Sequence, residues 1–257
     1  MIINHNIAAL NTHRQLSVAN NAQAKNMEKL SSGLRINRAG DDAAGLSVSE
    51  KMRSQLRGLD QASRNSQDGI SYLQTAEGAL TEVSAMALRL KELAVQKENG
   101  TYNTDDVANI DLEMAALGTE INNIINTTEF NGKNVFASEV DITVTEDAAV
   151  KLTIAAATLD STKGLTSTST VADIDTAIGE INLQRATYGS QQNRLEHTIN
   201  NLNTTNENLT ASESRIRDVD MAKEIMEQTK NSILSQASQA MLAQANQTPQ
   251  NVLQLLR

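Results

Sequence analysis

The chain has 257 residues and a net charge of −9, and although 39% of its residues are hydrophobic, only three Tyr and two Phe are aromatic. It has no Trp, no Cys and a single proline, which excludes disulfide frameworks, thiolate metal sites and cysteine nucleophiles. Aromatic rings normally fill a large share of a compact core, so regularly spaced aliphatic side chains in long helices are expected here instead.

The distribution of charged and apolar residues restricts the possible partners. Residues 101–180 hold 3 basic and 14 acidic side chains, whereas the two ends are nearly balanced. No basic face with interleaved aromatics occurs, so nucleic acid is not an expected partner. Membrane insertion is not expected either, because no apolar run approaches the ~18 residues that span a bilayer. The start of the chain also lacks the pattern of a cleaved secretory signal.

The first 60 residues show a sparse apolar stripe followed by a helix start. Ile3, Ile7 and Leu10, then Leu30 and Leu34, are spaced as on a weakly amphipathic helix. Gly40 interrupts this pattern. The adjacent carboxylates Asp41 and Asp42 suit the N-cap and first turn of a second helix, which is a better explanation for them than a catalytic pair.

Two regular seams follow. Apolar residues recur every three or four positions from Leu73 to Ala94, and again from Val107 to Ile124, on either side of a turn at 98–101. This spacing is typical of coiled-coil helices, and the short turn predicts that the two helices pair antiparallel.

The segment from Phe130 to about Thr170 has no helical pattern. Apolar and polar residues alternate over 140–144 and again over 150–154, which predicts a β-hairpin, and Phe130-Asn131-Gly132 predicts a turn just before it. Eight of the residues 158–170 are Ser or Thr, so an exposed, loosely ordered loop is expected there.

A third seam begins at Ile181 and repeats every seven residues to Ile216, while the positions three residues away, such as Gln184 and Gln191, are polar. A half-polar stripe of this kind is weak by itself and is expected to pack inside a bundle. Together the three seams nominate a bundle core that includes Leu73, Leu80, Val83, Leu90, Val107, Ile110, Met114, Leu117, Ile121, Leu195, Leu202 and Leu209.

The last 40 residues carry another thin stripe, through Ile225, Ile233 and Ala240. Ordering about 80 terminal residues costs on the order of 80–160 kcal/mol of backbone entropy. Stripes this thin do not offset that cost within one molecule. We therefore expect the two ends to fold by packing on each other and on neighbouring molecules.

Catalytic and metal-binding patterns are weak. The three histidines, His5, His13 and His197, lack metal-ligand spacing, and the chain has neither a phosphate-binding loop nor a nucleophile elbow. We expect no enzyme and no cofactor. On periodicity alone, a helical signalling adaptor remains an alternative to an assembly protein.

Long motifs at both ends resemble bacterial flagellins, the subunits of the flagellar filament. The resemblance covers about 1–136 and 181–257. The segments that carry it are Ile3-Asn4-His5-Asn6-Ile7-Ala8-Ala9-Leu10-Asn11-Thr12, Leu30-Ser31-Ser32-Gly33-Leu34-Arg35-Ile36-Asn37-Arg38-Ala39-Gly40-Asp41-Asp42, Ser214-Arg215-Ile216-Arg217-Asp218-Val219-Asp220 and Pro249-Gln250-Asn251-Val252-Leu253 through Arg257.

The resemblance implies a mainly α fold of long helices with a small β-hairpin region in the middle. Residues 1–42 and 218–257 would pair as an inner coiled coil. Residues 43–217 would form an outer helical bundle, with a β and loop region at about 130–178. The large variable outer region of longer relatives would be absent.

The function implied by the resemblance is that of a structural subunit that polymerises into the filament used for motility. A hook-filament junction protein of the same family is the alternative. The terminal residues expected to carry polymerisation are Ile3, Ile7, Leu10, Leu30, Leu34, Ile233, Ala240, Val252, Leu253, Leu255, Leu256 and Arg257.

The resemblance also implies partners and a location. Besides further copies of the chain, these are an export chaperone on the C-terminal helix, the filament cap, and hook-junction proteins. A host Toll-like receptor would recognise Leu88, Arg89, Leu93 and Glu113. Export through the flagellar channel would place the protein outside the cell, with a periplasmic filament as the alternative.

Overall fold

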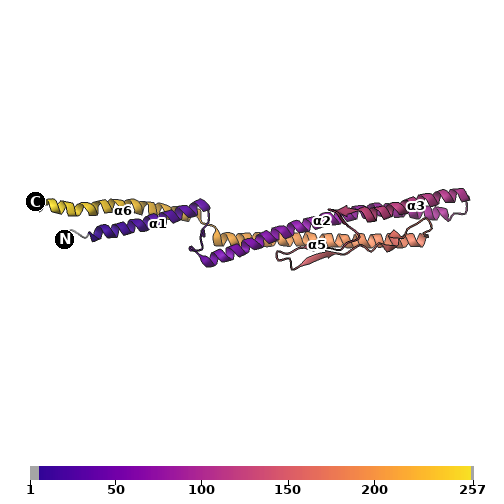
Figure 1. Cartoon of the computed structure of the whole chain (residues 1–257), viewed down its shortest axis with the longest axis horizontal. Coiled ribbons are helices and arrows are strands. Elements are labelled where there is room, and N and C mark those ends of the chain that lie inside the picture. Colours follow the sequence, from indigo (N-terminus) through magenta and orange to yellow (C-terminus); the bar gives the residue numbers. More distant parts are fainter. Residues whose placement is uncertain (1–5, 256–257) are drawn as a thin grey trace. The chain divides into compact units, whose positions relative to one another are not determined.

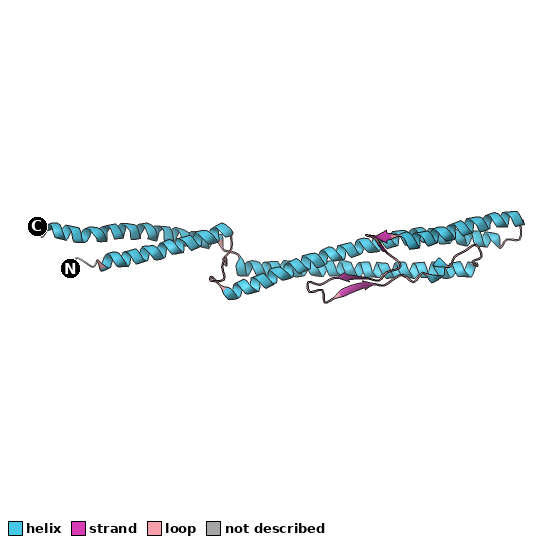
Figure 2. Cartoon of the chain, in the orientation of Figure 1, coloured by secondary structure: helices cyan, strands magenta, loops and turns pink. Residues whose placement is uncertain are grey.

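The protein consists mainly of long helices, as predicted (Figure 2). The computed structural model describes the backbone of residues 6–255 and the side chains of residues 6–248. The elements are α1 (Ile7–Ser32), α2 (Ala43–Lys97), α3 (Thr104–Thr127), β1 (Glu129–Phe130), β2 (Lys133–Asn134), β3 (Val140–Thr143), β4 (Lys151–Ile154), α4 (Asp160–Lys163), α5 (Val171–Arg217) and α6 (Met221–Leu255).

The chain divides into two compact units. One, here called the terminal unit, comprises the residues up to Ser54 and those from Asn208 onward. The other, the bundle unit, comprises Gln55–Glu207. Both units include part of α2 and part of α5, because these long helices extend across both boundaries.

In the terminal unit, α1 and α6 lie side by side and run antiparallel (Figure 1). Polar contacts near both ends of α1 establish the direction: the Asn6 amide donates to the Ala245 carbonyl (2.7 Å), and Lys29 lies 3.9 Å from the Glu224 carboxylate. Asn6 also caps the start of α1 by accepting from the Ala9 N–H. Gly33 ends the helix in the left-handed conformation, at φ 71°.

In the bundle unit, α3 and α5 each run antiparallel to α2. The Lys97 ammonium contacts Asp111 of α3 at 2.6 Å, and Asp60 of α2 accepts a hydrogen bond from Asn206 of α5 at 2.6 Å. Asn103 and Asp106 form a capping box at the start of α3. The antiparallel pairing of the first two seams is therefore as predicted.

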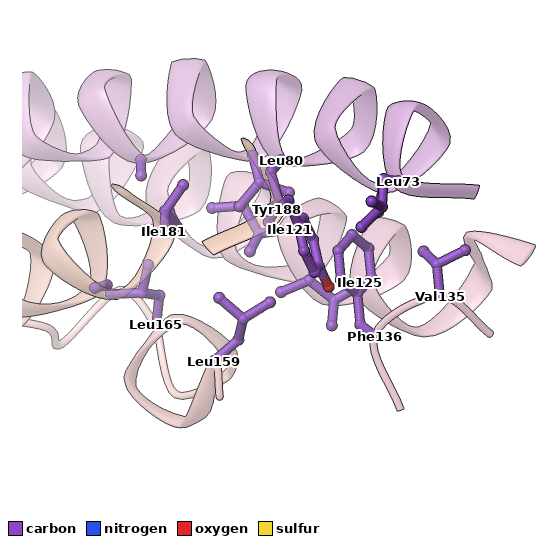
Figure 3. Close-up of a cluster of buried hydrophobic side chains, with 14 of the residues drawn as sticks. Leu73, Leu80, Ile121, Ile125, Val135, Phe136, Leu159, Leu165, Ile181 and Tyr188 are labelled. Carbon is purple, nitrogen blue, oxygen red and sulfur yellow. The ribbon is translucent and has the colours of Figure 1, made fainter. Parts of the chain in front are cut away.

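The core of the bundle unit lies between α2, α3, α5 and the hairpin segment (Figure 3). Leu80 of α2, Ile121 of α3 and Tyr188 of α5 lie together, and Leu73 of α2 lies near Ile125 and Phe136. Burial raises the pKa of the Tyr188 phenol to about 12.

The residues nominated for the core differ in burial. Leu73, Leu80, Val83, Leu90, Ile110, Met114, Ile121, Leu195 and Leu202 are buried. Val107, Leu117 and Leu209 are only partly buried. Val107 lies in the first turn of α3, and Leu209 lies beyond the end of the bundle unit, so each has fewer helical neighbours than a central position.

The amide row of α5 is buried in the bundle. Gln184 and Gln191 are both buried, and the Gln191 amide donates to the Thr153 carbonyl of β4 at 3.4 Å. A side chain that reaches a strand carbonyl in this way offsets part of the cost of burying a polar group. The polar half of the third seam therefore packs toward the β-hairpin.

The middle segment contains the predicted hairpin. β3 pairs antiparallel with β4, with Ile142 opposite Leu152. The turn at 130–132 is also present. It joins a shorter hairpin, β1–β2, in which Asn131 and Gly132 both have positive φ.

The expectation of a loose, exposed loop over 158–170 is correct in that most of these residues are exposed, but wrong for the part from Leu159 to Leu165. Residues 160–163 form a short helix, α4, and Leu159, Thr162 and Leu165 are buried. The Glu180 carboxylate of α5 accepts from the Ser161 and Thr162 N–H groups at 3.0 and 3.2 Å. The burial of its own two leucines and the contact with the Glu180 carboxylate therefore order a segment whose composition is typical of a solvated loop.

The expected helix start at Asp41–Asp42 is correct for one residue and wrong for the other. α2 begins at Ala43, and Asp42 accepts from the Gly45 N–H at 2.8 Å as a capping residue does. Asp41 lies before the helix and accepts from the N–H groups of Asn37 and Arg38 instead. The hydrogen bond from the Arg38 N–H is the main cause that lowers the pKa of Asp41.

The packing of the bundle core predicts how much a cavity there lowers the free energy of unfolding. Leu80→Ala should lower the free energy of unfolding by about 2–5 kcal/mol, because Leu80 is fully buried between helices and the vacated volume stays open. Leu183→Ala, on the exposed face of α5, is the matched control and should change it by less than ~0.5 kcal/mol. Urea unfolding followed by circular dichroism measures both. Equal effects would contradict this arrangement of the core.

Candidate assembly surfaces

The terminal unit exposes large apolar side chains on both of its long helices. On α6 these are Met221, Ile225, Met226, Ile233, Leu234 and Met241, and on α1 they are Ile7, Leu10, Val18 and Met27. Ile7 is 70% exposed and Ile233 is 61% exposed. Apolar side chains repeated along a helix pair in this way mark a surface for another protein or another copy.

The side of α6 that faces α1 is largely polar. The partly or fully buried positions of α6 mostly recur every three or four residues: Glu224, Gln228, Asn231, Ser232, Ser235, Ser238, Leu242 and Ala245. The corresponding side of α1 includes Leu16, Ala19, Gln23, Asn26 and Leu30. We call these two facing rows the seam. A conventional coiled coil places aliphatic residues at such positions.

Hydrogen bonds connect the two rows of the seam. From the α6 row, the Ser235 hydroxyl donates at 2.8 Å to the side-chain oxygen of Asn20, an exposed residue of α1 next to Ala19. With its amide oriented as its neighbours require, Asn26 donates to the Glu224 carboxylate and accepts from the Asn231 amide, both at 3.0 Å. Asn26 is 9% exposed and Ser235 is 6% exposed. The most enclosed side chains between the helices therefore include polar groups.

A short backbone ladder joins the end of α1 to the end of α5. The Arg35 N–H donates to the Arg217 carbonyl at 2.6 Å, and the Val219 N–H donates to the Gly33 carbonyl at 3.0 Å. The Arg35 guanidinium also donates to the Ile216 carbonyl at 2.6 Å. The segment before α2 and the segment before α6 are thus held together within the terminal unit.

The terminal residues nominated for polymerisation fall into three groups. Ile7, Leu10, Ile233 and Ala240 are exposed, whereas Leu30 and Leu34 are partly buried within the terminal unit. Ile3, Leu256 and Arg257 lie outside the described backbone, and Val252, Leu253 and Leu255 lie outside the described side chains. The sequence reasoning missed the polar seam, although its three-and-four spacing was available as a signal in Glu224, Gln228, Asn231 and Ser235.

The four residues nominated for receptor recognition do not share one surface. Leu88, Arg89 and Glu113 are exposed, and Arg89 contacts both Glu113 and Glu92 at 3.0 Å. Hydrogen bonds to Glu92 and Glu113 raise the pKa of the Arg89 guanidinium. Leu93 packs in the core and is only 2% exposed, so the prediction that its side chain belongs to this surface is wrong.

Among the residues that the structure describes, no group of three or more His, Asp or Glu side chains could hold a metal ion. Within the same range, the helices lack a stretch long and apolar enough to cross a membrane.

Comparison with known proteins finds matches along nearly the whole chain. Residues 3–141 match the model of the bacterial flagellin N-terminal helical region, and residues 171–256 match that of the C-terminal helical region. The flagellin of Bacillus subtilis (strain 168) is 53% identical, and the flagellar filament 33 kDa core protein of Treponema phagedenis is 48% identical; both alignments cover all of each chain. A crystal structure of Bacillus cereus flagellin, 35% identical, aligns with 54% of this chain and 88% of its own, at a TM-score of 0.49.

Proposed function

This chain belongs to the bacterial flagellin family and is a structural subunit of a flagellar filament, and we propose that its paired terminal helices carry the contacts by which copies polymerise. The observation that supports this role is the distribution of apolar side chains on α1 and α6. Ile7, Leu10, Ile233 and Met241 are turned outward, away from the seam. Burying such a side chain stabilises a complex by about 1.5–3 kcal/mol.

Filament growth gives these side chains the burial that one chain does not provide. Residues 1–42 and 218–257 form the inner part of the filament, and residues 43–217 form its outer helical bundle. A subunit with two different surfaces that bind each other head to tail builds an open helical assembly when the rotation between copies does not close a ring. The bundle unit already has a core of its own, so it enters the filament folded.

The filament acts mechanically. Subunits stack along a helix, and small or amide side chains along α6, such as Gln236, Ala237 and Ala240, allow neighbouring helices to adopt near-equivalent packings. Two packings that differ little in free energy give a bistable interface. A rotating filament built from such interfaces changes its supercoil without losing its contacts.

Further partners bind the same surfaces before and after assembly. An export chaperone covers the apolar side chains of 220–257 in the unassembled chain. Cap and hook-junction proteins contact the terminal helices at the two ends of the filament. A pull-down of the chaperone that succeeds equally with and without residues 220–257 would refute this assignment.

A second surface, formed by Arg89 and Glu113 with the neighbouring Leu88, is proposed as the recognition site for a host Toll-like receptor. These side chains are exposed and close together on α2 and α3. Arg89→Ala should weaken binding to the receptor ectodomain, because it removes the central cation of the group. Lys163→Ala, an exposed cation on α4, is the control and should leave binding unchanged. Equal binding by both variants would refute the site.

We propose that the protein lies outside the cell, and the alternative location is the periplasm. Flagellins are structural proteins rather than enzymes, and no observation on this chain favours a hook-junction protein or a signalling adaptor. Fractionation of the producing cell, with an antibody against the bundle unit, distinguishes the two locations. A signal confined to the cytoplasm would contradict both.

The outward apolar row of α6 predicts the effect of a single polar substitution. Ile233→Ser should slow growth on preformed filament seeds by about tenfold or more, because each lost apolar contact of ~1.5–3 kcal/mol is repeated at every added subunit. Gln239→Ser, an exposed polar position on the same helix, should grow within about twofold of the unmodified chain.

Light scattering or negative-stain electron microscopy measures the growth of both variants. The bundle unit of the Ile233→Ser chain should unfold at an unchanged temperature. Normal growth of this chain on seeds would mean that the outward row of α6 does not carry the contacts between subunits.

A further inference from the structure

The polar seam between α1 and α6 is unexpected in a helix pair that otherwise has enough aliphatic residues to build a conventional seam. Ile225, Met226, Ile233 and Leu234 occur in α6 but are exposed, while Asn231 and Ser235 face α1. The inner row of α6 is therefore mostly polar, whereas the inner row of α1 mixes amides with aliphatic residues such as Leu16 and Leu30. A rotation of α6 about its axis would place several aliphatic side chains against α1 and leave the amides in water.

We propose that the hydrogen-bonded side chains of the seam, above all Asn26 with Glu224 and Asn231, determine the register and rotation of α6 against α1. They thereby reserve the aliphatic side chains of both helices for neighbouring copies of the chain. The inference rests on the role proposed above for the terminal helices. It adds which residues decide what those helices present to the next subunit.

The geometry of Asn26 carries the first step. Its amide reaches two side chains of α6, Glu224 and Asn231, which lie seven residues apart on one face of that helix. Both contacts form only when Asn26 lies between those two positions. A shift of α6 by one heptad would remove at least one of them and leave an enclosed amide without its partner, which costs free energy.

A second contact specifies the same register independently. The Ser235 hydroxyl meets Asn20, about two turns before Asn26 on α1, and Asn20 and Asn26 are related to Ser235 and Asn231 by the same antiparallel alignment. Polar pairs are directional, whereas apolar contacts are not. A single enclosed asparagine is known to fix register in coiled coils at a cost in stability.

The consequence for assembly follows from the exposed side chains. In the observed rotation, Met226, Ile233 and Met241 lie on the outward side of α6, where a second copy can bury them. If α6 turned those residues toward α1, the single chain would gain apolar burial and the filament would lose it. The seam therefore lowers the stability of the helix pair within one subunit and leaves apolar side chains available for contacts between subunits.

The variant that tests this idea replaces the facing amides with a conventional apolar layer, Asn26→Leu with Asn231→Leu. Growth of the full chain on unmodified filament seeds should fall by about tenfold or more, because leucine layers pair in several registers. Asn193→Leu with Asn200→Leu is the matched control. It makes the same two exchanges at exposed asparagines of α5 in the bundle unit, and it should grow within about twofold of the unmodified chain.

Register is read out separately by cross-linking. The chain has no cysteine of its own, so introduced pairs report without background. Met27→Cys with Gln228→Cys is the in-register pair, since the Gln228 amide lies 3.5 Å from the Met27 sulfur. Met27→Cys with Met221→Cys reports a shift of one heptad. A short bismaleimide is applied to the seeded filaments and to the soluble fraction.

In the unmodified seam, the in-register pair should cross-link within one chain at least about fivefold more than the shifted pair in the filaments. With Leu at 26 and 231, the ratio in the same fraction, or in the soluble fraction if growth is abolished, should fall to within about twofold. An unchanged ratio, or growth at the unmodified rate, would overturn the inference. The Ile233→Ser chain separates the two proposals. If both this chain and the variant with Leu at 26 and 231 grow normally, the proposed role of the terminal helices fails. If Ile233→Ser stops growth and the variant with Leu at 26 and 231 grows normally, only the role of the seam fails.

Discussion

The structure depends on where the apolar side chains of α1 and α6 point. Their seam combines a few small or aliphatic residues, such as Leu16 and Ala19, with hydrogen-bonded amides, hydroxyls and one carboxylate, and many of their large aliphatic side chains face outward. A helix pair built in this way gains little from its own association, because burying polar groups contributes little net free energy even when they are hydrogen-bonded. Its favourable free energy comes mainly from burial among other copies.

The bundle unit, in contrast, buries its apolar side chains within one chain. Leu80, Met114, Ile121 and Leu195 are fully buried within one chain, and Glu180 and the capping box at Asn103 satisfy helix ends locally. This unit therefore has the density of apolar contacts that an independently folded domain needs. One chain thus combines a part whose core is internal with a part whose apolar surface is external, which is the combination that a filament subunit requires.

The sequence was sufficient for the features that depend on regular spacing. The seams of α2, α3 and α5 and the β3–β4 hairpin follow from periods of about 3.5 and 2, which report burial directly. The order of residues 159–165 was missed because it depends on the burial of Leu159 and Leu165 and on the contact with Glu180 of α5, which composition does not reveal. Leu93 was assigned to an exposed surface because a resemblance nominated it, whereas the structure packs its side chain in the core. The outward orientation of α6 also needed the structure, since its polar seam and its apolar rows have the same helical period.

Hydrogen exchange of α1 and α6 in dilute solution and in the filament tests the central claim most directly. If these helices gain their stability from neighbouring copies, their amides should exchange at least about a hundredfold more slowly in the filament than in the dilute chain, a difference of about 2.7 kcal/mol. The amides of the buried helices in the bundle unit should be strongly protected in both. Strong and equal protection of α1 and α6 in a solution that contains only single chains would contradict the account.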